Sequence, residues 1–163
     1  IPITVRLIPS YNLCRNLNML DTYMGMILPQ VAWSIPFGTF LMRQFYMGIP
    51  KQLDEAAKID GANHFQIFWK ILLPNTKSSM TTLGIYTFIS AWNNLIWMLL
   101  SVRSEGKWTV TLGISSICGA SVIKQPTWNL IMGVIVIGMI PVLILFFAFQ
   151  KYFMQSVAAT GIK

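Results

Sequence analysis

The sequence predicts an all-α membrane protein, a polytopic bundle of membrane-spanning helices. Its 163 residues are 55% hydrophobic and only 10% charged, whereas a soluble globular domain is about 25% charged. Three long stretches of the chain carry no charged side chain at all. The formal net charge of +7 does not indicate a nucleic-acid-binding protein, because twelve basic and five acidic residues cannot cover a soluble domain of this length. The high hydrophobicity also excludes a disordered tail.

The three uncharged stretches set the expected spans. They are 21, 25 and 26 residues long, and about 20 residues of helix cross the ~30 Å hydrocarbon core of a bilayer. Each stretch is therefore long enough to span. The expected spans lie near residues 23–43, 79–101 and 128–150.

The N-terminal segment, residues 1–20, is too short between charges to span, because only eight uncharged residues separate Arg6 from Arg15. We expect it to be the exit from an earlier helix. The chain starts at Ile1 without the charged leader of a signal peptide. The sequence is therefore expected to be a piece of a longer membrane protein.

The spans also predict a topology. They place residues 44–78 and 151–163 on one side of the membrane and residues 1–22 and 102–127 on the other. Seven basic residues against five favour the cytoplasm for the 44–78 side. The outer loop 102–127 is rich in Ser, Thr and Gly, so we expect a short interfacial or re-entrant segment there and not a fourth span.

Residues 49–74 predict two short helices that meet at a glycine corner. Pro50 suits the first turn of a helix, where a missing N–H is not needed. Gly61 can adopt the left-handed conformation that ends a helix. Asn63, with Gln66 three residues later, forms the pattern of a capping box at the start of the second helix.

The second helix of this loop has an apolar face, and Pro74 is expected to end it. Lys70 is its one basic residue, which disfavours a DNA-binding helix-turn-helix. Two uses remain open on spacing alone: a surface helix in the lipid headgroups and a docking element for another protein. The face consists of residues at positions i, i+3, i+4 and i+7: Phe65, Phe68, Trp69 and Leu72.

The most polar feature inside a span is the cluster Trp92, Asn93, Asn94 and Trp97. Amide and indole groups suit a path for a sugar, and asparagine equally suits hydrogen bonds between helices. No charged residue or histidine lies inside any expected span, which disfavours proton relays, metal sites and ion-coupled transport. The sequence offers no catalytic set and no phosphate-binding P-loop, so we expect nucleotide hydrolysis to belong to a partner.

One motif in the 49–74 loop resembles a known family. Glu55-Ala56-Ala57, then Gly61, then Ile71-Leu72-Leu73-Pro74 fit the pattern EAA-x3-G-x9-I-x-LP. This pattern is similar to the EAA loop in the membrane-spanning permease subunits of binding-protein-dependent ABC importers. Further short segments resemble the carbohydrate-type, MalG-like branch: residues 18–23, 25–29, 40–45, 91–97 and 150–153.

The resemblance implies that residues 1–163 are the C-terminal part of a single permease domain, in the cell inner membrane of a bacterium or archaeon. It implies a pore subunit for a sugar or related solute, with three protein partners: an ABC ATPase subunit dimer, a second permease subunit and an extracytoplasmic solute-binding protein. Membrane lipid is expected around it, and no cofactor, metal or nucleic acid. The alternative is a membrane anchor that recruits a cytoplasmic protein through residues 49–74.

In this family the EAA loop docks on the ATPase, so the resemblance implies that closure of the ATPase dimer moves the permease helices. The apolar face is expected to hold the contact and Glu55 to set its orientation. The residues implied in coupling are Glu55, Ala56, Ala57, Gly61, Phe65, Phe68, Trp69, Ile71, Leu73 and Pro74.

Overall fold

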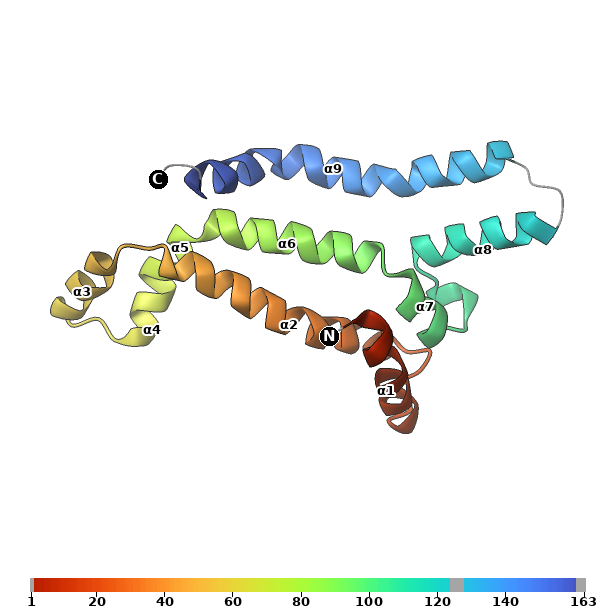
Figure 1. Cartoon of the computed structure of the whole chain (residues 1–163), viewed down its shortest axis with the longest axis horizontal. Coiled ribbons are helices and arrows are strands. Elements are labelled where there is room, and N and C mark those ends of the chain that lie inside the picture. The colour runs from red at the N-terminus through yellow and green to blue at the C-terminus, as the bar shows by residue number, and fades with distance from the viewer. Residues whose placement is uncertain (1, 124–127, 161–163) are drawn as a thin grey trace. The chain divides into compact units, whose positions relative to one another are not determined.

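The computed structural model describes residues 2–123 and 128–160, with the side chains of residues 2, 4–119 and 128–150 (Figure 1). Within these ranges the regular structure is helical and no strand occurs. The chain forms two compact units, which are considered separately below. The first unit comprises Ile1–Ser34 and Phe88–Ile144, and the second comprises Ile35–Thr87 and Leu145–Lys163.

Two long helices lie at the first and third predicted spans. Helix α2 runs over Tyr23–Met47, and α9 runs over Trp128–Thr160. By length and composition, α2 and the Trp128–Gln150 part of α9 could each cross a membrane. Both continue beyond the ends predicted from the charges, because a helix does not have to stop where the apolar run stops.

The middle span differs from the prediction of one continuous helix over 79–101. It is split into α6 (Lys77–Trp92) and α7 (Leu95–Ser101), which are bent by 52° relative to each other. The Asn94 side chain accepts a hydrogen bond from the Trp97 backbone N–H at 3.3 Å and so starts a new helix. Asparagine competes for backbone groups in this way, which hydrophobicity alone does not reveal. The pair is a broken span or a re-entrant loop.

Short helices occupy the segments that the sequence left outside the spans. Helix α1 covers Ile3–Asn16, about 21 Å of helix and too short to span, as expected. The expected outer loop 102–127 contains a 3-10 turn, Glu105–Lys107, and helix α8, Val110–Ile123. The apolar part of α8 is shorter than a span. Residues 124–127 of this loop lie outside the described residues.

The predicted loop 49–74 contains two short helices and a π-helical segment. Helix α3 is Lys51–Ile59 and α4 is His64–Ile67. The chain then widens into a π-helix over Phe68–Leu72 and returns to α-helix as α5, Leu73–Asn75. The helix ends at Asn75, one residue after the end predicted at Pro74. Pro74 sits in the first turn of α5, where its missing N–H is tolerated.

The core of the first unit joins α1, α2, α7 and α8. Its centre is Trp97, whose side chain is fully buried. Most of the outward-facing side chains of the long helices are apolar, as in a helix surrounded by lipid or by other helices. The buried core residues are Leu7, Cys14, Met26, Trp97, Met98, Val102 and Leu112.

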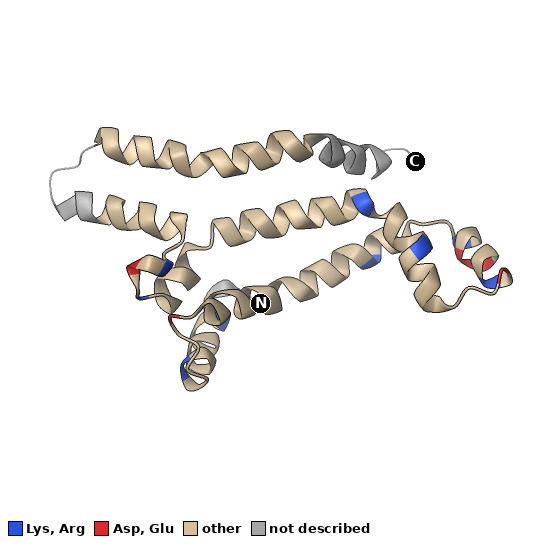
Figure 2. Cartoon of the chain, turned by 180° about the vertical axis from the view of Figure 1, so that it is seen from behind, with Lys and Arg blue, Asp and Glu red and all other residues tan. Residues whose placement is uncertain are grey.

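Charged side chains avoid the long helices. Figure 2 shows charged residues on the short helices α1 and α3, on the segment after α4 and on the turns, while α2, α6 and the described side chains of α9 are almost entirely uncharged. This distribution matches the membrane assignment, because a charged side chain in hydrocarbon costs several kcal/mol.

Candidate functional site

The glycine corner between α3 and α4 has the predicted geometry. Gly61 has φ +80°, the left-handed region that favours glycine. Its N–H donates to the Lys58 carbonyl at 3.0 Å, and the Ala62 N–H donates to the Ala57 carbonyl at 2.9 Å. A Cβ atom on Gly61 would meet no atom within 4 Å. Glycine is therefore required here by backbone conformation and not by lack of space.

The start of α4 is closed by the predicted capping box. The Gln66 N–H donates to Asn63 Oδ1 at 2.9 Å, and the Asn63 N–H donates to Gln66 Oε1 at 3.0 Å. These two bonds satisfy amides that a helix start leaves without partners. Together with Gly61 they fix the direction in which α4 leaves α3.

The EAA residues of α3 divide between a buried and an open side. Ala57 is buried, whereas Glu55 and Ala56 are exposed. Asp54 and Lys58 form an exposed ion pair one turn apart, at 2.6 Å, which stabilises by only about 0–1 kcal/mol. Ala57 thus packs against the rest of the protein, and Glu55 and Ala56 lie on the exposed side of α3.

Three of the four predicted apolar residues of the second helix lie together, because the Trp69 ring centroid is 6.2 Å from that of Phe65 and 5.7 Å from that of Phe68, but they differ in exposure. Phe65 and Trp69 are 73% and 53% exposed, whereas Phe68 is half-buried with its ring 6.2 Å from that of Tyr46. The π-helical segment changes the angle between successive residues from Phe68 onward. The exposed apolar surface is therefore smaller than expected and centres on Phe65 and Trp69.

Of the remaining residues that were predicted to act in coupling, Pro74 is exposed. Sequence reasoning missed Ile67, which is 3% exposed and is the buried anchor of α4. Its spacing of four residues from Ile71, another apolar residue, was the available signal. The half-buried members of the segment are Ile71, Leu72 and Leu73.

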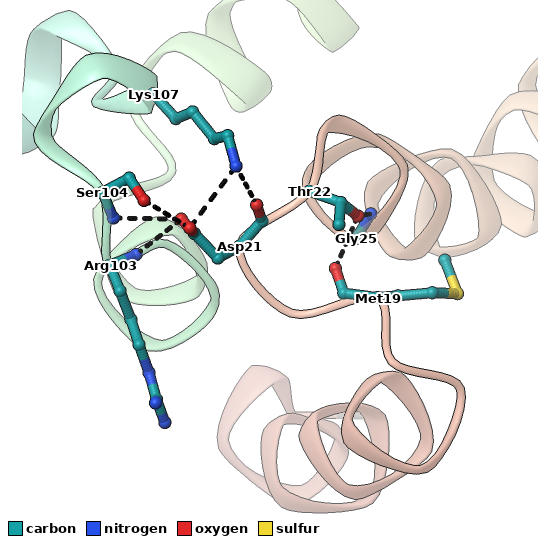
Figure 3. A network of polar contacts seen from close by, with 7 residues as sticks. All are labelled: Met19, Asp21, Thr22, Gly25, Arg103, Ser104 and Lys107. Carbon is teal, nitrogen blue, oxygen red and sulfur yellow. Dashed lines mark hydrogen bonds and ion pairs between the residues drawn. The ribbon is translucent and has the colours of Figure 1, made fainter.

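A polar network around Asp21 joins the turn before α2 to the turn after α7 (Figure 3). The Asp21 carboxylate accepts hydrogen bonds from the backbone N–H groups of Arg103 and Ser104, both at 3.0 Å. It also accepts from the Ser104 hydroxyl and the Lys107 ammonium. The Asp21 N–H donates to the Ser101 carbonyl at 2.7 Å. The Ser104 hydroxyl, then the two amides, hold the pKa of the Asp21 carboxyl well below its usual range.

The sequence analysis did not single out Asp21, because the network depends on residues more than eighty positions away. Asp21 also has φ +57°, an uncommon conformation for a residue other than glycine. The signal available in the sequence was the position of Asp21, an isolated acidic residue immediately before a predicted span. The hydrogen bonds of Asp21 hold the start of α2 and the end of α7 together within the first unit.

Gly25 and Trp97 form a close contact next to this network. The Gly25 N–H donates to the Thr22 hydroxyl at 3.1 Å, and that hydroxyl donates to the Met19 carbonyl at 2.6 Å. The Gly25 carbonyl accepts from Trp97 Nε1 at 3.1 Å. A Cβ atom on Gly25 would lie 2.1 Å from the Met19 oxygen. Only glycine allows the turn to approach α2 this closely.

A mainly apolar cavity of about 540 Å³ lies within the first unit. Phe88 and Trp92 are stacked with ring centroids 5.6 Å apart, and both line it together with Trp108. Of the four predicted path residues, Trp92 lines this cavity and Asn93 is exposed. The other two make contacts inside the fold. Asn94 caps a helix, and Trp97 is a buried core residue.

The polar lining of the cavity comes from Gln30 and from two threonines, Thr109 and Thr111. The Thr111 hydroxyl donates to the Trp92 carbonyl. Among residues 2–123 and 128–160, no three His, Cys, Asp or Glu side chains are grouped so that they could hold a metal ion. The cavity thus offers aromatic faces and a few uncharged polar groups.

Comparison with known proteins identifies the family. The family model described as "Binding-protein-dependent transport system inner membrane component" matches residues 2–159. The sn-glycerol-3-phosphate transport system permease protein UgpE of Yersinia enterocolitica is 38% identical over 157 residues, which are 96% of this chain and 54% of that protein. The arabinooligosaccharides transport system permease protein AraQ of Bacillus subtilis is 31% identical over 163 residues, 100% of this chain and 56% of that protein.

A solved structure gives the same result. The crystal structure of a bacterial ABC transporter involved in the import of the acidic polysaccharide alginate matches with a TM-score of 0.72 at 30% identity, over 90% of this chain and 55% of that chain. The present chain spans about half the length of the curated relatives it matches. Since the family model covers nearly the whole chain, this protein belongs to the family of binding-protein-dependent transport system inner membrane components.

Proposed function

We propose that the chain is part of a transmembrane pore subunit of an ATP-driven importer for a sugar or related solute. The observation that carries this proposal is the α3–α4 hairpin, which combines a fixed glycine corner at Gly61 with exposed apolar side chains. A rigid hairpin of this kind suits the transmission of a movement from one protein to another. The ATPase that drives the movement would be a separate subunit.

Contact with the ATPase would rest on the apolar side chains. Phe65, Trp69 and Ile59 are 73%, 53% and 86% exposed. Burial of such side chains contributes up to about 1.5–3 kcal/mol each, whereas an exposed ion pair of Glu55 would contribute about 0–1 kcal/mol. The apolar groups therefore supply most of the affinity, and Glu55 orients the contact.

The remaining partners follow from the same proposal. A second permease subunit would complete the pore, and an extracytoplasmic solute-binding protein would deliver the solute. The relatives are named for sn-glycerol-3-phosphate and arabinooligosaccharides, and the structural neighbour for alginate. All three are polyhydroxylated, and two carry an acidic group. The proposed solute is accordingly a carbohydrate or a polyol derivative.

The solute path is proposed to include Trp92 and Asn93. Trp92 lines the cavity of the first unit, where an indole face can stack on a sugar ring, and Asn93 is exposed beside it. Asn94 and Trp97 are proposed to hold the bend between α6 and α7, because both are engaged within the fold. This favours the helix-contact alternative for these two residues.

The decisive experiment uses Gly61→Val in the full-length protein, reconstituted with its partner subunits. A β-branched residue at φ +80° is strained, so α4 leaves the corner in a different direction. We expect normal membrane insertion, continued ATP hydrolysis and loss of solute uptake. The matched control is Gly84→Val, since a Cβ atom there meets no atom within 4 Å and the helix φ is ordinary.

Normal uptake by Gly61→Val would contradict the coupling role. The anchor alternative predicts a different pattern: the cytoplasmic partner would bind through the hairpin, and no solute uptake would respond to any change in it. Measuring partner co-purification and uptake on the same samples separates the two functions.

A further inference from the structure

Arg6 on α1 has an unusual environment within the first unit. Its guanidinium carbon lies 4.6 Å from the centroid of the Trp33 ring. Trp33 packs edge-to-face on Trp97, with centroids 5.2 Å apart, and Trp97 is itself anchored on Gly25. A cation held over an aromatic face is stabilised and oriented by the ring. The two tryptophans therefore form a fixed support for the guanidinium.

The charge of Arg6 is not balanced by the described part of the chain. Its Nε is buried and has no hydrogen-bond partner, and no described carboxylate pairs with the side chain. The acids in this unit are Asp21, which is engaged by Ser104 and Lys107, and Glu105, which is exposed. A partly buried cation without a counter-charge is costly.

The other arginines of the first unit differ in this respect. Arg15 and Arg103 are exposed and can be hydrated, whereas Arg6 is half-buried. Water compensates a charge on the surface but cannot reach the covered Nε of Arg6. This arrangement is typical of an arginine that receives a partner from elsewhere.

The chemistry of that partner follows from the guanidinium. Arginine presents planar, paired N–H donors that match the two oxygens of a carboxylate or phosphate. Because the Nε edge is covered, the two terminal Nη groups are the donors available to such a ligand. Trp33 lies one helical turn after Gln30, and Gln30 lines the cavity. Arg6 therefore lies against the helix that borders the cavity, while Arg6 and Trp33 themselves lie outside its lining.

We propose that Arg6 binds an oxyanion, the carboxylate or phosphate group of an acidic sugar or polyol carried by this protein. The inference rests on the proposed transport function and narrows its solute class to acidic members. The same chemistry has a second source, an acidic side chain of another polypeptide in the assembled transporter. The experiment has separate arms for the two sources.

Binding is measured on the full-length protein, assembled with its partner subunits in nanodiscs without the binding protein, by tryptophan fluorescence. The probes are glucuronate and glucose 1-phosphate, with glucose as the uncharged comparison. Trp33, beneath the guanidinium, is a built-in reporter. We expect the acidic probes to bind at least about tenfold more tightly than glucose, since charge-assisted hydrogen bonds are strong.

The variants test the assignment to Arg6. Arg6→Gln is expected to remove the preference for acidic probes, and Arg6→Lys to keep part of it, because lysine keeps the charge without the paired geometry. Arg15→Gln, an exposed arginine on the same helix, is the matched control and is expected to behave as wild type.

Two results would overturn the proposal. One is equal affinity of the wild-type transporter for acidic and neutral probes, and the other is an acidic preference that survives in Arg6→Gln. If Arg6→Gln also releases the second permease subunit while the wild type shows no acidic preference, the oxyanion belongs to a protein side chain and not to the solute. If the transporter still takes up a neutral sugar with ATP after either of these results, the transport function stands and only the role of Arg6 is refuted. Failure of the Arg6 proposal is thereby distinguished from failure of the transport function.

Discussion

The substitution Gly25→Ala adds one methyl group at the point where the turn before α2 comes closest to the helix, and so tests that contact. The added Cβ would lie 2.1 Å from the Met19 oxygen and 2.9 Å from the Met19 carbonyl carbon. Both are backbone atoms, so the turn must move away from the helix. That movement strains the Thr22 hydroxyl bond to Met19, and it displaces the Gly25 carbonyl that accepts from Trp97.

The magnitude follows from three contributions. Overpacking costs about 1–3 kcal/mol, and two weakened hydrogen bonds cost about 0.5–1.5 kcal/mol each. The gain in helix propensity from glycine to alanine offsets about 0.5–1 kcal/mol of this. A net loss of about 1–5 kcal/mol in the free energy of unfolding is therefore expected for Gly25→Ala.

The assay is thermal unfolding of the full-length protein in detergent, followed by intrinsic fluorescence. Gly133→Ala on α9 is the matched control, because a Cβ atom there meets no atom within 4 Å. We expect Gly133→Ala to unfold at or slightly above the wild-type temperature and Gly25→Ala clearly below it. Equal unfolding temperatures for wild type and Gly25→Ala would refute the reasoning.

Three further predictions concern the same contacts. The pKa of Asp21 is lowered in the folded state, so its carboxylate stabilises the fold above the unfolded pKa of about 3.9 and this stabilisation is lost as the pH falls through the folded value. The difference in unfolding temperature between wild type and Asp21→Asn should be constant from about pH 5 to pH 8 and should shrink below about pH 4; a difference that does not shrink in acid contradicts the network. Trp97→Phe removes the indole bond to the Gly25 carbonyl and should lower the free energy of unfolding by about 1–3 kcal/mol, because a buried acceptor loses its donor; urea unfolding at wild-type stability would show that this bond is unimportant. Asn63→Ala removes the capping box and should weaken the start of α4 by about 0.5–2 kcal/mol, which is read as faster hydrogen exchange of the α4 amides with α9 unchanged; equal exchange would contradict the cap.

The sequence predicted the spans because lipid imposes a local rule. Every residue of a spanning helix must be tolerable in hydrocarbon, so uncharged runs identify the helices that α2 and α9 later show. The glycine corner and the capping box were predictable for a similar reason. Each depends on residues within five positions of one another, around Gly61 in one case and between Asn63 and Gln66 in the other.

The apolar spacing of the sequence was misleading where the chain changes from α-helix to π-helix. The apolar spacing around Phe68 assumed α-helix throughout, and the π-helical segment before Pro74 changed which side chains are buried. The break at Asn94 was hidden by the apolar residues on both sides of it. Hydrophobicity reports the environment of a segment but not the path of its backbone.

The sequence by itself determined that this is a helical membrane protein with a hairpin of EAA type, because those features depend on composition and on neighbours in the chain. Only the tertiary structure decided that Asp21 binds the turn at Ser104, that Trp97 is fixed on Gly25 across 72 residues, and that Arg6 rests on Trp33. The physical reason is that each of these contacts requires two distant segments to meet. Their meeting is set by the packing of whole helices, which no single stretch of sequence specifies.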